Sequence, residues 1–536
     1  MKKQFLRLIA LVLAMAMLAG CSILEDYQRL KEAYFGRSFT AFSDMEYERP
    51  APEDVMQYQR ECIALAEEGK DLDALAENIW DFYTEYDRFY TLYTLADIHY
   101  SMDMSDLYWS DEYDWCLEKS SEIDAAYDQL MYAFAASPLR DKLEGDDLFG
   151  PGYFDSYEGE SIWDETLTKL MEEESALVMR YEEMSMDLPD SEDPAYEAAA
   201  MELADLLAEL IALRQEQAAY LGYDSYVNFA SEFYYGRDYT PEQERAYVEQ
   251  VKETLVPLYR RVCKMTNEEL GYYSATEDQV FWYLEMAAEN MGGIVEEAFG
   301  TMESCELYDI SMGKNKYPAS FAVYIWDYEM PFVFLNPEGS NYDALSFAHE
   351  FGHFCNEYAS YGTSLNVDCG EVLSQGMEYL SLCYTEGTEE MVAMKMADSI
   401  CTYVEQAAYT AFEHAAYELR GEELTGENLV KLYEDVTVEF GFDAWGEYNG
   451  TELVELTHLY GYPCYVFSYV VSNDAAMQIY QLELEEEGKG LKIYEDCLTS
   501  DAWDLTEFVR EAGLESPFAE GRLEDVKAIF EAVFGS

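Results

Sequence analysis

The chain reads Ala348-His349-Glu350-Phe351-Gly352-His353 near its middle, which is an HExxH pattern. Phe347, Phe351 and Phe354 recur at helical spacing, which indicates a helix with one face in a core. Residues four apart on such a helix differ by only about 40° in azimuth, so both imidazoles project to the same side. Two ring nitrogens can then bind one zinc ion, with Glu350 beside them as candidate general base for water.

A catalytic zinc site usually has three protein ligands and one position open to water. The metzincin pattern HExxHxxGxxH is excluded, because Asn356 and Ala359 stand at its glycine and third-histidine positions. The third ligand must therefore come from another segment.

The next expected helix, Cys369 to Tyr384, carries Glu371 and Glu378 two turns apart and hence on one face. Glu378 follows His353 by 25 residues, enough for a helix end, a loop and a returning helix. We predict that His349, His353 and Glu378 bind the metal. Glu371, or alternatively Asp368, would accept the other N–H of a ligating histidine and fix its tautomer.

The composition is that of a globular, strongly acidic protein. The 536 residues include 32 basic and 110 acidic ones, with a formal net charge of -78 and 49% hydrophobic residues. Such a field repels nucleic acid, which excludes nucleic-acid binding, and it attracts cationic peptides. A surface that merely keeps the protein soluble explains the acidity equally well. None of the eleven cysteines forms a CxxC pair, so we expect mostly buried thiols.

The first residues predict secretion. Met1-Lys2-Lys3 and Arg7 precede an apolar run, Leu8 to Leu18, that is short for a membrane-spanning helix. The run ends Leu18-Ala19-Gly20-Cys21, which resembles a bacterial lipobox. We therefore expect a signal peptide over residues 1–20, lipidation of Cys21 and an extracytoplasmic protein that is attached to the membrane only by this anchor.

The remaining sequence is dominated by helical patterns. Residues Glu197 to Leu221 carry a leucine stripe, and Thr240-Pro241 marks a helix start that continues to about Val262 with a kink at Pro257. Two strand-like stretches, 320–324 and 331–335, precede the HExxH helix. We divide the chain into a tether over 21–50, an N-terminal helical lobe over 51–300 and a catalytic zinc-binding domain over 301–536.

At these motifs the chain resembles the thimet oligopeptidase and oligoendopeptidase F family of zinc peptidases. The HExxH helix is similar to the family's A-H-E-[FL]-G-H, and residues 371–378, EVLSQGME, look like its E-x-x-S-x-x-x-E. Residues 213–226, residues 238–242 and residues 313–321 extend the match. The resemblance implies a mainly α, two-lobed zincin with a small β-sheet beside the active-site helix and a deep central channel.

The stretch from His458 to Tyr469 resembles the family's C-terminal histidine–tyrosine segment. It implies that His458 and a phenol stabilise the oxyanion that forms during peptide hydrolysis. We rank Tyr469 first and Tyr462 second, with Tyr465 still open, since Phe467 replaces a frequent tyrosine.

These features predict a zinc-dependent oligoendopeptidase with one zinc ion, acting as a monomer on short peptides. A substrate would extend along the edge of the small sheet near Phe321 and Ala322. Two alternatives stay open. One is a related metallopeptidase that trims residues from chain ends, and the other is a lipid-anchored peptide-binding protein that keeps the zinc fold without catalysis.

Overall fold

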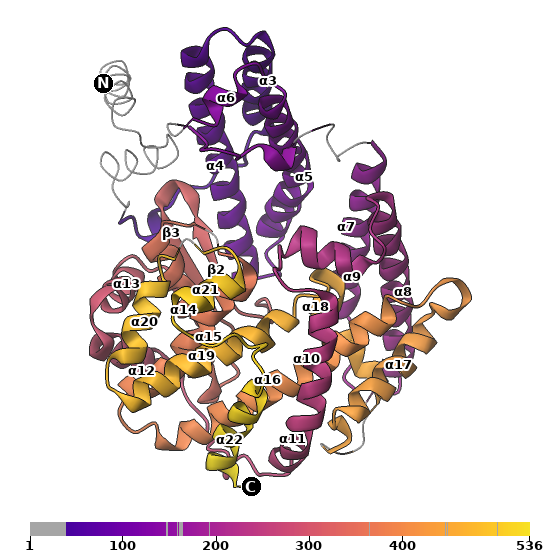
Figure 1. Cartoon of the computed structure of the whole chain (residues 1–536), viewed down its shortest axis with the longest axis vertical. Helices are drawn as coiled ribbons and strands as arrows, with labels where there is room; N and C mark the ends of the chain where they lie inside the picture. The colour runs from indigo at the N-terminus through magenta and orange to yellow at the C-terminus, as the bar shows by residue number, and fades with distance from the viewer. Residues whose placement is uncertain are drawn as a thin grey trace.

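The computed structural model describes residues 39–535 except 146, 147, 158, 160–164, 192, 364, 445, 447, 448 and 501. These residues fold into many helices and one three-stranded sheet, so the predicted mainly α class is confirmed (Figure 1). The expected signal peptide and Cys21 lie outside the described residues. Within the described part of the chain, no helix is both long and apolar enough to cross a membrane.

Long N-terminal helices form a separate hydrophobic cluster. They stand above the rest of the molecule at the top of Figure 1. Phe82, Phe89 and Phe134 are fully or almost fully buried among them. The helices are α3 (Pro52–Glu68), α4 (Leu72–Met102), α5 (Leu107–Ala135) and the short α6 (Arg140–Leu143).

A second cluster lies on the right of Figure 1 and contains the predicted leucine stripe. Leu203, Leu206, Leu207 and Leu210 are buried on one helix, as expected, and Arg214 is buried with them. The elements are α7 (Glu165–Met186), α8 (Tyr196–Tyr220), α9 (Tyr226–Phe229), the π-helix η3 (Ala230–Tyr234), α17 (Gly426–Glu439) and α18 (Thr457–Gly461).

The largest cluster surrounds the HExxH helix. The predicted helix start is confirmed, because Thr240 caps α10 in a capping box with Pro241 in the first turn, and the helix breaks at Leu255. The elements are α10 (Pro241–Thr254), α11 (Val256–Val262), α12 (Glu277–Met291), α13 (Gly293–Ser304), α14 (Tyr342–Ser360), α15 (Val367–Tyr384), α16 (Glu389–Ala416), α19 (Phe467–Glu485), α20 (Lys489–Cys497), α21 (Leu505–Glu511) and α22 (Arg522–Phe534).

The hydrophobic clusters do not follow the expected boundary at residue 300. Helices α10 to α13 pack in the same core as α14 and α15, although the sequence analysis placed them in the N-terminal lobe. The reason is that their apolar side chains, including Leu284 and Phe299, lie in the same cluster as those of α14 and α15, whereas most of the apolar side chains of α3 to α5 form a cluster of their own.

The small sheet has the strand order β1-β3-β2. The antiparallel pair β2 (Phe321–Ile325) and β3 (Met330–Phe334) confirms the two predicted strands within one residue. The sequence analysis missed β1 (Tyr308–Asp309), a two-residue strand parallel to β3 that is too short to give a pattern. Within the described residues β3 is the only strand that pairs with β2, which makes β2 an edge strand of the sheet.

Helices α14 and α15 touch backbone to backbone at Gly352. A Cβ atom there would lie 2.6 Å from the carbonyl oxygen of Leu373 and 2.6 Å from the Cα atom of Ser374. Only glycine permits this approach, which brings the HExxH residues against Glu371 and Glu378 of the returning helix.

The Gly352→Ala substitution tests this contact. We expect the methyl group to force the helices apart and to lower the free energy of unfolding by about 1–3 kcal/mol, as measured by urea denaturation. Gly370→Ala on α15 is the matched control, because nothing lies within 4 Å of its Cβ position and alanine favours a helix. Equal stability of the two variants would contradict the close packing.

Candidate metal centre and active site

Three side chains from α14 and α15 form a group that can hold a metal ion. One ligand atom from each of His349, His353 and Glu371 lies within 4.8 Å of the others. The Oε2 atom of Glu371 is 3.4 Å from Nε2 of His349 and 3.8 Å from Nε2 of His353. The imidazoles are partly exposed, with 20% and 26% of their side-chain surface accessible, so the group is open on one side.

The position of Glu378 differs from the one we expected of the third ligand. Its Oε1 atom lies 2.8 Å from Nδ1 of His349, on the opposite ring nitrogen from the one that faces Glu371. A carboxylate there accepts the Nδ1–H and leaves Nε2 free to bind a metal. The structure therefore corrects the prediction, since the two glutamates exchange the positions that we assigned to them. Asp368, the other candidate, contacts Tyr239 and Arg237.

Helix direction explains the exchange. The short connection 361–366 returns the chain, so α14 and α15 are antiparallel neighbours in contact at Gly352. Glu371 then lies level with His353, and Glu378 lies level with His349 at the other end. Spacing along one helix puts both carboxylates on the same face, but it cannot decide which one reaches the shared centre.

A buried lysine continues the network from Glu378. The Nζ atom of Lys395, which is 2% exposed, donates to Oε2 of Glu378 at 2.6 Å and to Asp398 at 2.8 Å. Asp398 in turn accepts a hydrogen bond from Tyr342 at 2.7 Å. Sequence reasoning missed Lys395, because a lysine on a helix is normally solvated and no spacing ties it to the HExxH motif.

The electrostatic environment favours positive charge between the helices. Burial alone would lower the pKa of His349, but hydrogen bonds to Glu371 and Glu378 raise it well above its usual range. Burial would raise the pKa of Glu371, yet hydrogen bonds from His349 and Tyr465 and the charge of His353 bring it down to about 2. Glu371 is thus ionised, and a cation placed beside it would be stabilised.

Glu350 is buried on the same helix, between the imidazoles and the sheet. Burial raises its pKa to about 7, against the effect of the His349 charge and a hydrogen bond from Ser320. Ser320 directly precedes Phe321 and Ala322, which are half-buried on the edge strand β2. The predicted general base and the predicted peptide-binding strand are therefore neighbours.

The His458–Tyr469 segment also lies close to the site. The Tyr469 hydroxyl is 3.5 Å from Nε2 of His458. Burial, followed by the negative charges of Glu371 and Glu350, raises the pKa of Tyr469 well above its usual range. The Tyr465 hydroxyl donates to Glu371 at 2.6 Å. The ring of Tyr462 is 6.3 Å from that of His458 and is 63% exposed. Their catalytic roles stay predictions.

Two buried arginines hold this segment from either end. Arg214 donates to the backbone carbonyls of Leu459, at 2.9 Å, and Tyr460. Arg237 donates to the Ser468 hydroxyl at 2.8 Å and to the carbonyl of Tyr465. Both guanidinium groups also contact buried or half-buried carboxylates, so each is held rigidly.

Glu413 of α16 holds the middle of the segment. Its Oε1 atom accepts a hydrogen bond at 2.6 Å from the backbone N–H of Cys464, whose φ of 64° lies in the left-handed region. This backbone conformation is costly for a residue other than glycine, so the buried carboxylate helps to stabilise the turn.

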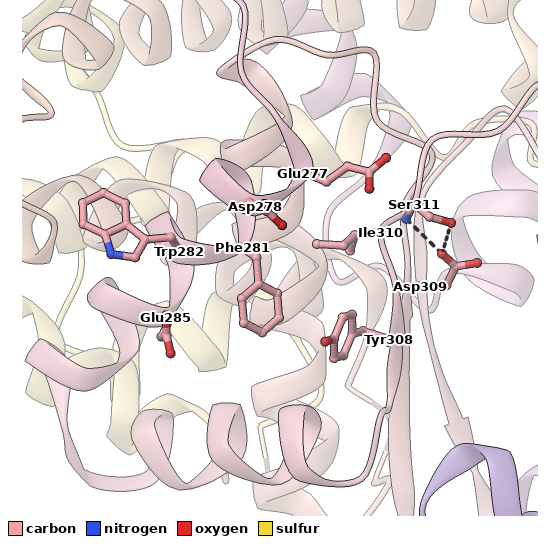
Figure 2. A pocket seen from close by; sticks show the side chains of 9 residues that line it. All are labelled: Glu277, Asp278, Phe281, Trp282, Glu285, Tyr308, Asp309, Ile310 and Ser311. Atoms are coloured by element: carbon pink, nitrogen blue, oxygen red, sulfur yellow. Dashed lines mark hydrogen bonds between the residues drawn. The ribbon is translucent and has the colours of Figure 1, made fainter.

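A separate cavity of about 410 Å³ lies between α12 and the β1 segment (Figure 2). Acidic and aromatic side chains such as Glu277, Glu285 and Trp282 line it, and Asp309 there accepts two hydrogen bonds from Ser311. It contains none of the predicted site residues and is distinct from the metal centre.

Comparisons with known proteins concern the fold and the N-terminal part of the chain. Residues 42–161 match the family model of the peptidase M3 N-terminal domain. A 3.1 Å crystal structure described as an oligoendopeptidase F shares 21% identity over 93% of this chain and 99% of that chain, with a TM-score of 0.80. PZ peptidase A, solved with an inhibitor, shares 20% identity over 92% of this chain and 99% of that chain, with a TM-score of 0.79.

A third structure, described as an oligoendopeptidase F from Bacillus anthracis str. Ames, shares 19% identity over 93% of this chain and 98% of that chain, with a TM-score of 0.76. No curated protein sequence matches the chain. The predicted resemblance is confirmed. The match of the N-terminal part to the M3 model and the fold shared with the oligoendopeptidase F structures support a metallopeptidase.

The sequence motifs located the candidate site but not all of its parts. No role was predicted for Ser320 or Lys395. Tyr465 stayed an open candidate for the phenol that stabilises the oxyanion. Arg214 lies within residues 213–226, which extend the family resemblance. The sequence alone therefore indicated that this position is important.

Glu413 gives a pH-dependent prediction. Burial raises its pKa from 4.5 to about 7, so between these values the folded chain holds a proton that the unfolded chain has lost. The resulting stabilisation is complete below pH 4.5 and disappears as the pH rises through 7, a change of roughly 3 kcal/mol. Glu413→Gln keeps the acceptor for Cys464 and should remove this part of the pH dependence.

The measurement is urea unfolding of wild type and variant at pH 5, 6, 7 and 8. We expect the variant to gain stability relative to wild type as the pH rises. Glu418→Gln, at an exposed position just beyond the same helix, is the control and should follow wild type. A constant difference between Glu413→Gln and wild type would contradict the assignment.

Proposed function

We propose that the chain is a zinc-dependent oligoendopeptidase that hydrolyses internal bonds of short peptides outside the cytoplasmic membrane. The observation that carries the proposal is the convergence of His349, His353 and Glu371 on one partly open centre, with Glu350 beside it. The M3 domain match and the fold shared with the oligoendopeptidase F structures support the same class of activity.

The donor set fits zinc. Zinc binds nitrogen and oxygen ligands at about 2.0–2.2 Å, and two ligands of a tetrahedral ion at that distance are about 3.4 Å apart. The Oε2 atom of Glu371 lies 3.4 Å and 3.8 Å from the two imidazole nitrogens. We therefore assign the ligand role to His349, His353 and Glu371 and the orienting role to Glu378, which accepts the Nδ1–H of His349.

The side chains around this centre supply the remaining steps. A zinc ion held by these residues would supply Lewis acidity toward the scissile carbonyl and toward water. Glu350, whose pKa is near 7, accepts the proton of the attacking water and delivers it to the leaving amine. His458 and Tyr469 donate hydrogen bonds to the oxyanion, and Tyr465 orients Glu371.

The edge strand β2 suits an extended substrate. It lies at the edge of the sheet, where a peptide backbone can add as a further strand, and Phe321 and Ala322 lie next to Ser320, which contacts Glu350. A peptide paired there runs past the general base in both directions, which favours internal cleavage over trimming of an end. Product mapping on a ten-residue peptide blocked at both ends distinguishes the two modes, because a trimming enzyme leaves it intact.

Three isosteric variants test the roles of the carboxylates. Glu350→Gln should keep zinc and lower kcat by about 10²–10⁴-fold, because only the proton acceptor is lost. Glu371→Gln should lose zinc to a mild chelator, since a neutral amide is a poor ligand. Glu378→Gln should keep zinc with about 10–100-fold lower affinity, because its amide oxygen still accepts from His349.

Zinc content and peptide turnover are measured for each folded variant. Glu405→Gln, at a partly buried glutamate of α16 that accepts a hydrogen bond from Tyr259, is the control and should retain both. In wild type a chelator should abolish turnover and zinc should restore it. Turnover that survives complete removal of metal would reject the proposed function. Weaker zinc binding by Glu378→Gln than by Glu371→Gln would reject the ligand assignment.

From the lipobox-like residues Leu18-Ala19-Gly20-Cys21, we propose that Cys21 carries a lipid anchor and that the protein lies outside the cytoplasmic membrane. Cys21→Ser should move the protein from the membrane fraction to the soluble fraction of the producing bacterium, because acylation needs the thiol. Immunoblotting of the two fractions measures this, with a serine substitution at the buried Cys62 as control. An unchanged distribution would contradict lipidation.

A further inference from the structure

Lys395 is a buried cation close to the metal centre. Its Nζ atom lies 2.6 Å from Oε2 of Glu378, whose other oxygen is 2.8 Å from Nδ1 of His349. Lys395 also stands over the ring of Tyr379, at 4.8 Å from the ring centre. Of the two carboxylate oxygens, one is thus occupied by the lysine and the other by the histidine, which leaves Glu378 little freedom to rotate.

The contacts of Lys395 close a ring through three helices. Lys395 and Asp398 lie on α16, Glu378 on α15, and both His349 and Tyr342 on α14. The Tyr342 hydroxyl donates to Asp398 at 2.7 Å, two helical turns before His349. Each helix is therefore tied to the other two, and the orientation of the His349 ring depends on the whole ring of contacts.

The charges show what the lysine does. Glu378 and Asp398 are two carboxylates that share one ammonium group, in a region where Glu350 and Glu371 add further negative charge. Without the ammonium, the Oε2 atom of Glu378 would lose its buried partner, and the carboxylate would be free to turn away from His349. The Nδ1–H of His349 would then lose its acceptor.

We propose that Lys395 is a positioning residue for the metal centre, which sets the zinc affinity by holding Glu378 against Nδ1 of His349. The inference rests on the proposed zinc site. It goes beyond that site because Lys395 touches none of the three ligands. A buried ion pair can also serve stability alone, and the two roles differ in what they do to zinc binding by the folded protein.

The experiment measures the zinc dissociation constant of full-length folded protein by competition with a chromogenic chelator. Lys395→Met keeps the length of the side chain without the charge and should weaken zinc binding by about 10–100-fold. The matched control is Arg522→Met, which removes a buried cation that pairs with Asp474 instead of with a carboxylate beside the metal centre, and it should leave zinc affinity unchanged.

Two further variants separate the outcomes. Asp398→Asn removes one of the two carboxylates that pair with Lys395, at a less buried position, and should also weaken zinc binding. It serves as the test if Lys395→Met does not fold. The double variant Glu378→Gln with Lys395→Met should bind zinc no more weakly than the weaker single variant, because both act through the same contact.

Each result has one meaning. Wild-type zinc affinity in folded Lys395→Met, or in Asp398→Asn where the former does not fold, overturns the inference and leaves the proposed function standing. Additive losses in the double variant overturn it as well, since they would show independent effects. Failure of the wild-type protein to bind zinc would instead reject the proposed function.

Discussion

The contact between α14 and α15 at Gly352 is the constraint on which the rest of the site depends. Because the backbones meet there, the two histidines and two glutamates can reach one another across the helix pair. A larger spacing would leave His349 and His353 pointing toward carboxylates too distant to share a metal ion. The antiparallel direction then decides which glutamate faces which ring nitrogen, and so it determines the chemistry of each.

The helix pair concentrates negative charge, and the surrounding structure offsets it. Glu350, Glu371 and Glu378 are all buried within a short distance of His349, an arrangement that is unfavourable without cations. Lys395 neutralises the buried side of the cluster, whereas the more open side between the Nε2 atoms suits a divalent ion. The same burial that makes the site costly keeps Glu350 near pKa 7, where a group can both accept and release a proton.

Much of the fold and part of the site could be predicted from the sequence, for identifiable reasons. The HExxH helix, the Thr240 cap, the two main strands and the leucine stripe carry periodic or capping signals that depend on near neighbours only. The choice between Glu371 and Glu378 depends on how two helices align, which spacing within one helix does not encode. Lys395 and β1 were missed for the same reason, since only tertiary contacts distinguish them from an exposed lysine and a loop.

The segment from His458 to Tyr469 joins two hydrophobic clusters, whereas α14 and α15 pack in only one of them. Leu459, Tyr460 and Cys464 pack in the cluster around α8 and α17, whereas Phe467 and Val470 pack in the core around α14 and α15. The proposed metal ligands all come from the second of these cores. A relative shift of the two clusters would therefore move His458 toward or away from the proposed metal centre without disturbing the ligand side chains. The buried Arg214 and Arg237, one in contact with each end of the segment, make the distance between His458 and that centre depend on how these clusters pack.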